Sequence, residues 1–184
     1  MNGIDSKADA ARAGGDGENA GDGENAGDGN NAGDGNNAGG IDHGFGDLSA
    51  LSAEQMGHRL DGFGVNLLVR QVARTVEFLR EALEFTVLRQ SDDYAVLAWR
   101  GRLFQLHADA TYAAHPLPAH LPEAGLRGAG VELRLYRADP DRAEQRARVH
   151  GYEILQATAD KPHGLRECFL LDPDGYCWVP SARI

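Results

Sequence analysis

The sequence is poor in the features that mark several protein classes. Its two cysteines, Cys168 and Cys177, are too few for a disulfide scaffold and fit a reducing compartment. No apolar run approaches the ~20 residues needed to cross a bilayer. The amino-terminal stretch also lacks the apolar core that a secretory signal needs. These absences predict a cytoplasmic protein without a membrane partner.

Basic residues are scarce as well. The 184 residues include 18 Lys and Arg against 28 Asp and Glu, which gives a net charge of −10. Residues 1–61 hold 12 acidic and 3 basic residues, so nine of the ten net negative charges lie there and residues 62–184 are nearly neutral. Without a basic surface to neutralise phosphates, nucleic acid is not an expected partner.

The amino-terminal part contains a six-residue repeat without large apolar side chains. It occurs four times between Gly15 and Ala38, twice as GDGENA and twice as GDGNNA. Such units bury almost no apolar surface, and ordering their glycines is costly in backbone entropy. We predict that residues 1–61 form a disordered acidic tail with hexad repeats and a linker. Calcium binding is the alternative, but calcium-binding β-roll repeats have a nine-residue period and an apolar residue in each turn.

The end of this tail contains one segment with a different pattern, Ser49–Arg59. It predicts a short helix capped by Ser49 or Ser52. Its apolar side chains would share one side: Leu48, Leu51 and Met56. The segment is interpreted either as a short docking element or as a loose linker.

Residues 62–184 predict two copies of the same order: a strand, a helix and three strands. Apolar residues at helical spacing predict a helix over Val72–Leu83. A second helix, Pro140–His150, begins at a proline, where the missing N–H costs nothing, and Gly151 ends it. The expected strands are residues 62–69, 85–89, 94–99 and 103–107, then 131–136, 152–155, 165–171 and 176–179. Between the copies, residues 109–130 predict a long surface loop.

This order resembles the glyoxalase/bleomycin-resistance/dioxygenase superfamily, also called vicinal oxygen chelate (VOC) proteins. The similarity covers about residues 62–181. It is carried by VNLLVRQVARTVEFLREALEFTVL and GLRECFLLDPDGYCWV, whose DPDG hairpin is the most specific piece. The nearest resemblance is to bleomycin-resistance-type members. It implies an α+β fold of duplicated βαβββ modules, and a homodimer whose clefts bind small molecules.

Metal-dependent members of this superfamily place ligands at four strand positions that face the cleft. Matching motif to motif puts those positions near Gly64, Gln105, Glu132 and Val179. Glycine and valine cannot donate to a cation, so fewer than the usual three protein ligands remain. The resemblance therefore implies no metal and no other cofactor. A rearranged metal site from His107, Glu132 and His163 is the alternative.

Strand alternation predicts cleft residues without reference to metals. In 131–136 it places Val131, Leu133 and Leu135 under a helix and the residues between them in the cleft. Together with the matched positions, the predicted ligand contacts are Asn66, Leu68, Gln105, His107, Glu132, Arg134, Tyr136 and Val179. Whether Glu132 and Arg134 form a simple ion pair or contact a ligand stays open.

The same alternation applies to the last hairpin. Closing it over Asp172–Gly175 pairs Leu170 with Cys177 and Cys168 with Val179. Those four residues would face the cleft, and the helix side would take Phe169, Leu171, Tyr176 and Trp178. The two cysteines are then diagonal neighbours, so we expect free thiols.

Three functions are compatible with these patterns. The first is metal-independent binding or sequestration of a small organic molecule in a homodimer cleft, which the loss of ligands at Gly64 and Val179 favours. The second is a metal-dependent lyase, isomerase or dioxygenase of the glyoxalase type. The third is a non-enzymatic interaction protein that uses its acidic tail. The sequence assigns no catalytic residue and does not identify the ligand.

Overall fold

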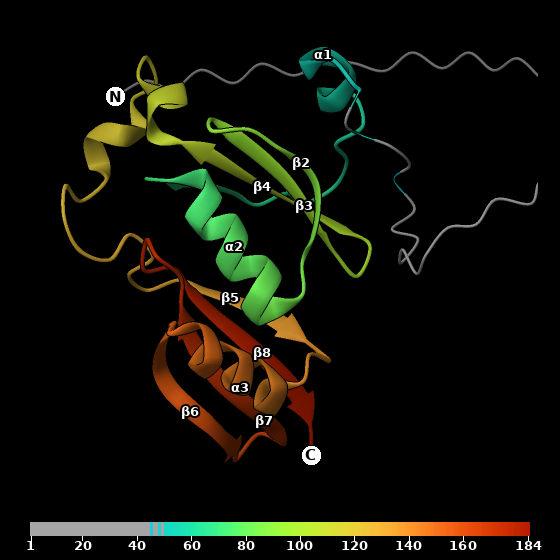
Figure 1. Ribbon diagram of the computed structural model, residues 1–184, viewed down its shortest axis with the longest axis vertical. Helices are drawn as coiled ribbons and strands as arrows, with labels where there is room; N and C mark the ends of the chain where they lie inside the picture. The colour runs from blue at the N-terminus through green and yellow to red at the C-terminus, as the bar shows by residue number, and fades with distance from the viewer. Residues whose placement is uncertain (1–44, 46–47, 49) are drawn as a thin grey trace, which may run out of the picture. The chain divides into compact units, whose positions relative to one another are not determined.

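The computed structural model describes Phe45, Leu48 and residues 50–184 (Figure 1). The hexad repeats, and Ser49 as a possible helix cap, lie outside the described residues. The described chain contains two consecutive βαβββ units, each with one four-stranded sheet. The predicted α+β fold with a duplicated module is therefore confirmed.

The first unit has the strand order β1-β4-β3-β2, with β1 parallel to β4 and the other neighbours antiparallel. Its elements are β1 (Asn66–Val69), α2 (Val72–Leu83), β2 (Thr86–Gln90), β3 (Tyr94–Trp99) and β4 (Arg102–Ala108). The second unit repeats the pattern as β5-β8-β7-β6. Its elements are β5 (Glu132–Tyr136), α3 (Pro140–His150), β6 (Glu153–Lys161), β7 (Leu165–Leu171) and β8 (Cys177–Arg183).

Both long helices have the predicted bounds, for reasons that the sequence contains. Helix α3 is capped by Asp139, whose side chain accepts a hydrogen bond from the Arg142 backbone N–H at 3.0 Å. It ends at Gly151, which has a φ of 72°, a conformation that glycine adopts without strain. Three short helices lie in the connecting segments: α1 (Ala53–Gly57), η1 (Asp109–Tyr112) and η2 (Leu117–His120). No helix among the described residues is both long and apolar enough to cross a membrane.

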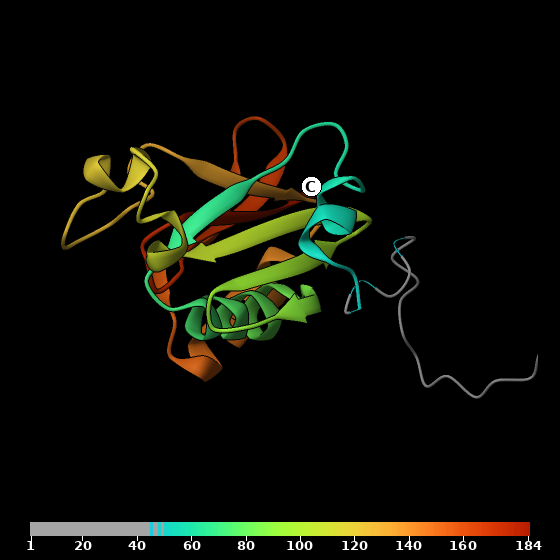
Figure 2. The same ribbon diagram turned by 90° about the horizontal axis from the view of Figure 1, so that it is seen from above.

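Side chains from both units form one core. Helices α2 and α3 contact each other, and Figure 2 shows the green helix α2 lying against one face of its own sheet. The rings of Phe85 and Phe104, from the first unit, contact Trp178 of β8 at centroid distances of 5.5 Å and 5.2 Å. Trp178 is fully buried, as its size makes favourable. The helix-facing sides of the two sheets are thus joined, and their opposite, concave sides remain for other roles.

Helix α3 is fastened to β6 by Glu144. Hydrogen bonds from Thr158, at 2.5 Å, and from Arg148, at 2.6 Å, lower the pKa of this carboxyl from 4.5 to about 2. Because the pKa is lower in the folded state, the stabilisation is complete above about pH 4.5 and is lost as the pH falls towards 2. Between about pH 5 and 2, the unfolding free energy of Glu144→Gln should decrease less than that of the unchanged protein, as measured by urea titration. An unchanged pH profile would contradict this role.

Candidate functional site: the concave faces of the two sheets

The loop of the last hairpin, between β7 and β8, is one residue shorter than the sequence predicted. The Asp172 backbone N–H donates to the Tyr176 carbonyl at 3.1 Å, so these two residues form the last pair before the turn. The loop proper is Pro173–Gly175, and Gly175 takes a φ of 86°. This is the three-residue hairpin loop that ends in a left-handed residue. The predicted loop had counted Asp172 as part of the turn.

This difference reverses the predicted faces of β7, whereas the residues of the second strand, from Tyr176 to Val179, lie on the faces predicted for them. The structure pairs Leu171 with Cys177 and Leu170 with Trp178, so the predicted pairing of Leu170 with Cys177 is wrong by one residue. A shift of one residue moves every side chain of a strand to the other face. The concave face holds Phe169, Leu171, Cys177 and Val179, and the helix side holds Cys168, Leu170, Tyr176 and Trp178.

Both cysteines are free, as predicted, but they lie on opposite faces of the sheet. Burial raises the pKa of the Cys168 thiol to about 12. It also raises the pKa of Cys177. Neither thiol is therefore activated as a nucleophile at neutral pH.

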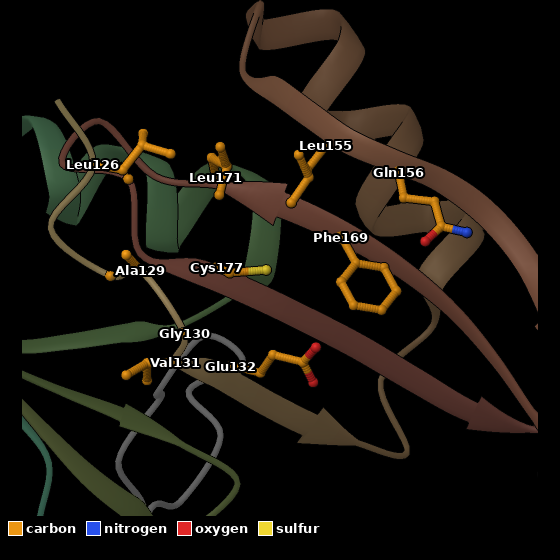
Figure 3. Close-up of a pocket in the computed structure, with 12 residues that line it drawn as sticks. Leu126, Ala129, Gly130, Val131, Glu132, Leu155, Gln156, Phe169, Leu171 and Cys177 are labelled. Atoms are coloured by element: carbon orange, nitrogen blue, oxygen red, sulfur yellow. The ribbon is translucent and has the colours of Figure 1, made fainter.

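The concave face of the second sheet forms the wall of a hollow of about 900 Å³. Figure 3 shows Leu155, Phe169 and Leu171 on one side of it and Glu132 on the opposite side. The lining residues are Leu126, Gly128, Ala129, Gly130, Val131, Glu132, Leu155, Gln156, Phe169, Leu171, Gly175 and Cys177. Of the eight predicted ligand contacts, only Glu132 is among them. The remaining wall is mostly apolar.

Val131 belongs to this hollow and does not pack under a helix as predicted. Strand β5 begins at Glu132, and Val131 is held in a turn by a 3.0 Å hydrogen bond from its N–H to the Gly128 carbonyl. Strand alternation therefore does not apply to it. Gly128 itself allows close packing: a Cβ at this position would lie 2.6 Å from the Tyr176 Cα. The loop that carries Leu126 is thus seated on the last hairpin and closes one side of the hollow.

One end of the concave face is polar. Arg134 donates to Glu132 at 2.7 Å and also forms an ion pair with Glu167, whose side chain is only 2% exposed. His163 Nε2 lies 3.2 Å from the same Glu167 carboxylate, and the Ser181 hydroxyl lies 3.4 Å from it. Burial opposes a charge on Glu167, but the hydrogen bond from His163 and the charge of Arg134 together keep its pKa below the usual range. Arg134 is therefore committed to a buried carboxylate, and Glu132 is the more accessible charge.

The remaining predicted contacts are dispersed. Val179 is fully buried, whereas Tyr136 is exposed and stands 5.6 Å from the Arg134 guanidinium. Leu68 is buried in β1, where its carbonyl accepts a hydrogen bond from the Tyr176 hydroxyl at 3.0 Å. None of these three residues lines the hollow.

A second group of predicted contacts lies on the first sheet. Asn66 Nδ2 donates to the Tyr112 hydroxyl at 2.6 Å, and the ring of His107 is 5.3 Å from that of Tyr112 and 4.5 Å from that of Tyr94. Gln105 lies two residues before His107 and on the same face of β4. Burial lowers the pKa of His107, which keeps it neutral at pH 7. The predicted residues therefore lie on both sheets, four in the first unit and four in the second.

The long loop between the units is anchored by buried charges. Arg127, whose side chain is 5% exposed, donates to Asp109 at 2.5 Å, and its Nε lies 3.4 Å from Asp174 of the last hairpin. Asp174 also accepts a 2.8 Å hydrogen bond from the Arg70 guanidinium. The predicted surface loop is thus tied at Arg127 to both units, and Asp174, the second acidic residue of the DPDG turn, helps to hold it in place.

The residues at the family's metal positions do not fit a catalytic metal centre. Gly64 has no side chain, Val179 offers only a buried alkyl group, and Glu132 is paired with an arginine. Within residues 45, 48 and 50–184, no three His, Cys, Asp or Glu side chains gather as a metal ion would require. His107, in β4, and His163, before β7, therefore do not join Glu132 in the rearranged site considered above.

Comparison with known proteins identifies the fold family. The model of the Glyoxalase/Bleomycin resistance protein/Dioxygenase superfamily matches residues 59–179. A glyoxalase/bleomycin resistance protein/dioxygenase from Nocardioides has a similar structure, with 21% identity, a TM-score of 0.53, and coverage of 70% of this chain and 89% of that chain. A family enzyme from Burkholderia phytofirmans is 15% identical, with a TM-score of 0.55 and coverage of 65% and 95%.

A glyoxalase-related enzyme from Fulvimarina pelagi is also similar, with 15% identity, a TM-score of 0.55, and coverage of 67% of this chain and 89% of that chain. Comparison with curated protein sequences gives no match. At these identities the solved structures show a shared fold alone, while the family model spans most of the folded part. Its match, together with the duplicated βαβββ units and the DPDG hairpin, shows that the chain belongs to the glyoxalase/bleomycin resistance protein/dioxygenase superfamily.

Proposed function

We propose that this protein binds or sequesters a small amphipathic organic molecule in the hollow of the second sheet, without a metal, in the manner of bleomycin-resistance-type proteins. The observation that carries the proposal is the hollow itself. Its volume of about 900 Å³ lies within the range of small-molecule sites. Its walls are mostly apolar, and the matched metal positions offer too few donors for metal chemistry.

The charges near the hollow indicate the chemistry of the ligand's polar end. Arg134 is held by Glu132 and the buried Glu167, so it has little capacity left for an anionic ligand. Glu132 lines the hollow, and only its Oε2 is engaged by Arg134. The other oxygen is a hydrogen-bond acceptor. The proposed ligand therefore has an apolar body and at least one amine or hydroxyl donor.

The rim of the hollow supports a homodimer as part of the proposal. Three of its apolar residues are exposed in the single chain: Leu126, Val131 and Leu155. Exposed apolar side chains around one hollow are typical of an interaction surface. A second copy of the chain would cover this rim and enclose the ligand.

A charge placed in the hollow should prevent binding without disturbing the fold. Leu155 lines the hollow and is 59% exposed, so Leu155→Glu needs no repacking of the core. We expect it to weaken binding of an uncharged amphipathic alcohol, found by thermal-shift screening, at least about tenfold because the carboxylate must be desolvated against the apolar body. Glu132→Ala should weaken the same ligand, measured by titration calorimetry.

The matched control is Val149→Glu, at a 76% exposed apolar position of α3 that does not line the hollow. It should bind the ligand as the unchanged protein does. Sedimentation of the same samples tests the dimer. Equal affinity in Leu155→Glu and Val149→Glu would place the ligand elsewhere and defeat the proposal. Arg134→Ala is not suitable here, because it would leave Glu167 buried with His163 as its one remaining basic partner.

A further inference from the structure

The two duplicated sheets use their concave faces differently. The second sheet leaves a hollow, whereas the corresponding face of the first sheet is covered by the chain itself. Leu48 and Met56, which precede the first unit, are only 2% and 3% exposed and pack on Val96 of β3. The rest of this cluster comprises Phe45 and Leu51 from the covering segment and Leu88, Tyr94 and Leu103 from the sheet.

The covering segment, of which Phe45, Leu48 and residues 50–60 are described, is built as a small separate unit. The Ser52 hydroxyl accepts a hydrogen bond from the Gln55 N–H at 3.1 Å, and the Gln55 side chain accepts one from the Ser52 N–H at 2.9 Å. This reciprocal capping box starts a helix of only five residues. Such a helix is not stable alone in water, so the segment is ordered by its docking. The docking alternative predicted for it is therefore the one that the structure shows.

The attachment uses side chains and not strand pairing. Among the described residues, the first sheet consists of the four strands β1, β4, β3 and β2, and the covering segment adds no strand to it. Arg89 of β2 donates to the Leu51 carbonyl at 2.7 Å. The Arg59 guanidinium closes the segment on itself by a 3.2 Å hydrogen bond to the Phe45 carbonyl. A unit held in this way can leave without breaking the sheet.

The covered face adjoins polar groups suited to a ligand. Tyr94 belongs to the covered cluster and also contacts His107, and Leu103 shares its strand face with Gln105 and His107. Removing the segment would therefore expose an apolar floor that ends in an amide and a neutral imidazole. This combination is the counterpart, on the first sheet, of the apolar wall and polar end found on the second.

We propose that the covering segment, through Phe45, Leu48, Leu51 and Met56, is a displaceable plug, which occupies in cis a second binding groove on the concave face of the first sheet. The groove recognises an amphipathic segment whose leucine and methionine side chains enter the cluster around Val96. The plug is its tethered occupant and keeps competing apolar ligands out. This inference does not depend on ligand binding in the hollow of the second sheet.

Hydrogen exchange of the unchanged full-length protein tests whether the plug opens separately. The amides of Met56 and His58 are hydrogen-bonded within the plug, at 2.9 Å and 3.0 Å. If the plug leaves locally, they exchange at least about 100-fold faster than amides of the central strand β3, such as Leu97. Exchange of plug and strand amides at one common rate would show that the segment opens only with the whole fold, and would overturn the proposal.

A binding experiment tests whether the vacated groove accepts the same segment in trans. The full-length double variant Leu48→Asp, Met56→Asp should expel the plug and bind a labelled synthetic peptide of residues 45–60 at least about tenfold more tightly than the unchanged protein, measured by fluorescence anisotropy. The matched control is Ala53→Asp, His58→Asp, which changes two exposed positions of the same segment. It should keep the groove closed, and a peptide carrying the two Asp changes should not bind.

The double variant Leu48→Asp, Met56→Asp is called the release variant. If it shows fast exchange in the plug but no affinity for the peptide, the groove is not a recognition site. Equal peptide binding by the release variant, the control variant and the unchanged protein would lead to the same conclusion. Tight binding confined to the release variant would establish the plug as a cis competitor.

Discussion

Replacing Trp178 with alanine is expected to lower the free energy of unfolding by about 3–5 kcal/mol, the range for removing a buried large aromatic side chain. Trp178 is 1% exposed and stands between the two units. Its ring contacts Phe85 and Phe104, and its Nε1 donates to the Asp172 carboxylate at 3.1 Å. Alanine would leave a cavity in the shared core and remove a partner from a buried acid.

Two further variants separate the contributions of the aromatic ring, its hydrogen bond and its position between the units. Trp178→Phe keeps much of the aromatic contact and loses the hydrogen bond, so it should cost less than the alanine change but more than a conservative surface change. Trp99→Ala removes a partly buried tryptophan at the edge of the same core and should cost less than Trp178→Ala. Urea unfolding measures all three. Equal losses for Trp99→Ala and Trp178→Ala would contradict a special role for the ring between the units.

Asp174→Ala should have the second large effect, on the order of 3–5 kcal/mol, because it removes one partner from a buried charge network. The Asp174 carboxylate is 3% exposed and accepts hydrogen bonds from the backbone N–H and the guanidinium of Arg70. It also lies beside the buried guanidinium of Arg127. Without it, Asp109 is the one carboxylate left beside Arg127, and the loop loses this side-chain attachment to the last hairpin, while the backbone hydrogen bond from the Arg127 N–H to the Asp174 carbonyl, at 2.9 Å, remains.

The matched control for this change is Asp141→Ala. Asp141 pairs with Arg166 at 2.7 Å, a distance similar to that between Asp174 and Arg70, but both side chains are exposed. We expect the control to leave the unfolding free energy nearly unchanged, since solvent screens an exposed pair. A double-mutant cycle of Asp174→Ala with Arg127→Met measures the coupling between these two residues. Additive effects would show that Asp174 acts through Arg70 only.

The elements of the fold could be predicted from sequence because their signals are local. Helices Val72–Leu83 and Pro140–His150 were bounded by apolar spacing and by capping residues that act within one turn. Strand β6 was predicted to end at Leu155 but continues to Lys161. Its later residues are largely polar, and only pairing with β7 makes them a strand. That pairing is a tertiary contact, which a local pattern does not contain.

The candidate site was harder to predict because it depends on register. The loop after Asp172 is one residue shorter than predicted, and this difference determines which face of β7 lines the hollow. Val131 and Leu126 enter the hollow from a loop, where strand alternation gives no orientation. Glu132 was predicted correctly as facing the concave side, because β5 is regular from its first residue. The glycine at position 128 was the one available signal that the loop approaches the hairpin closely.

The shared core has a consequence for the duplicated architecture. The only covalent link between the units is the connection after η1, whose residues 113–116 are exposed. Each unit contributes rings that the other needs, so each alone would present an unfilled half of one aromatic cluster. The chain thus behaves as two unlike subunits joined by a tether, and the length of that tether sets their effective concentration for one another. If the backbone were cut at 113–116, the same contacts would hold two separate fragments together. The fragments would then reassemble only at concentrations above their dissociation constant.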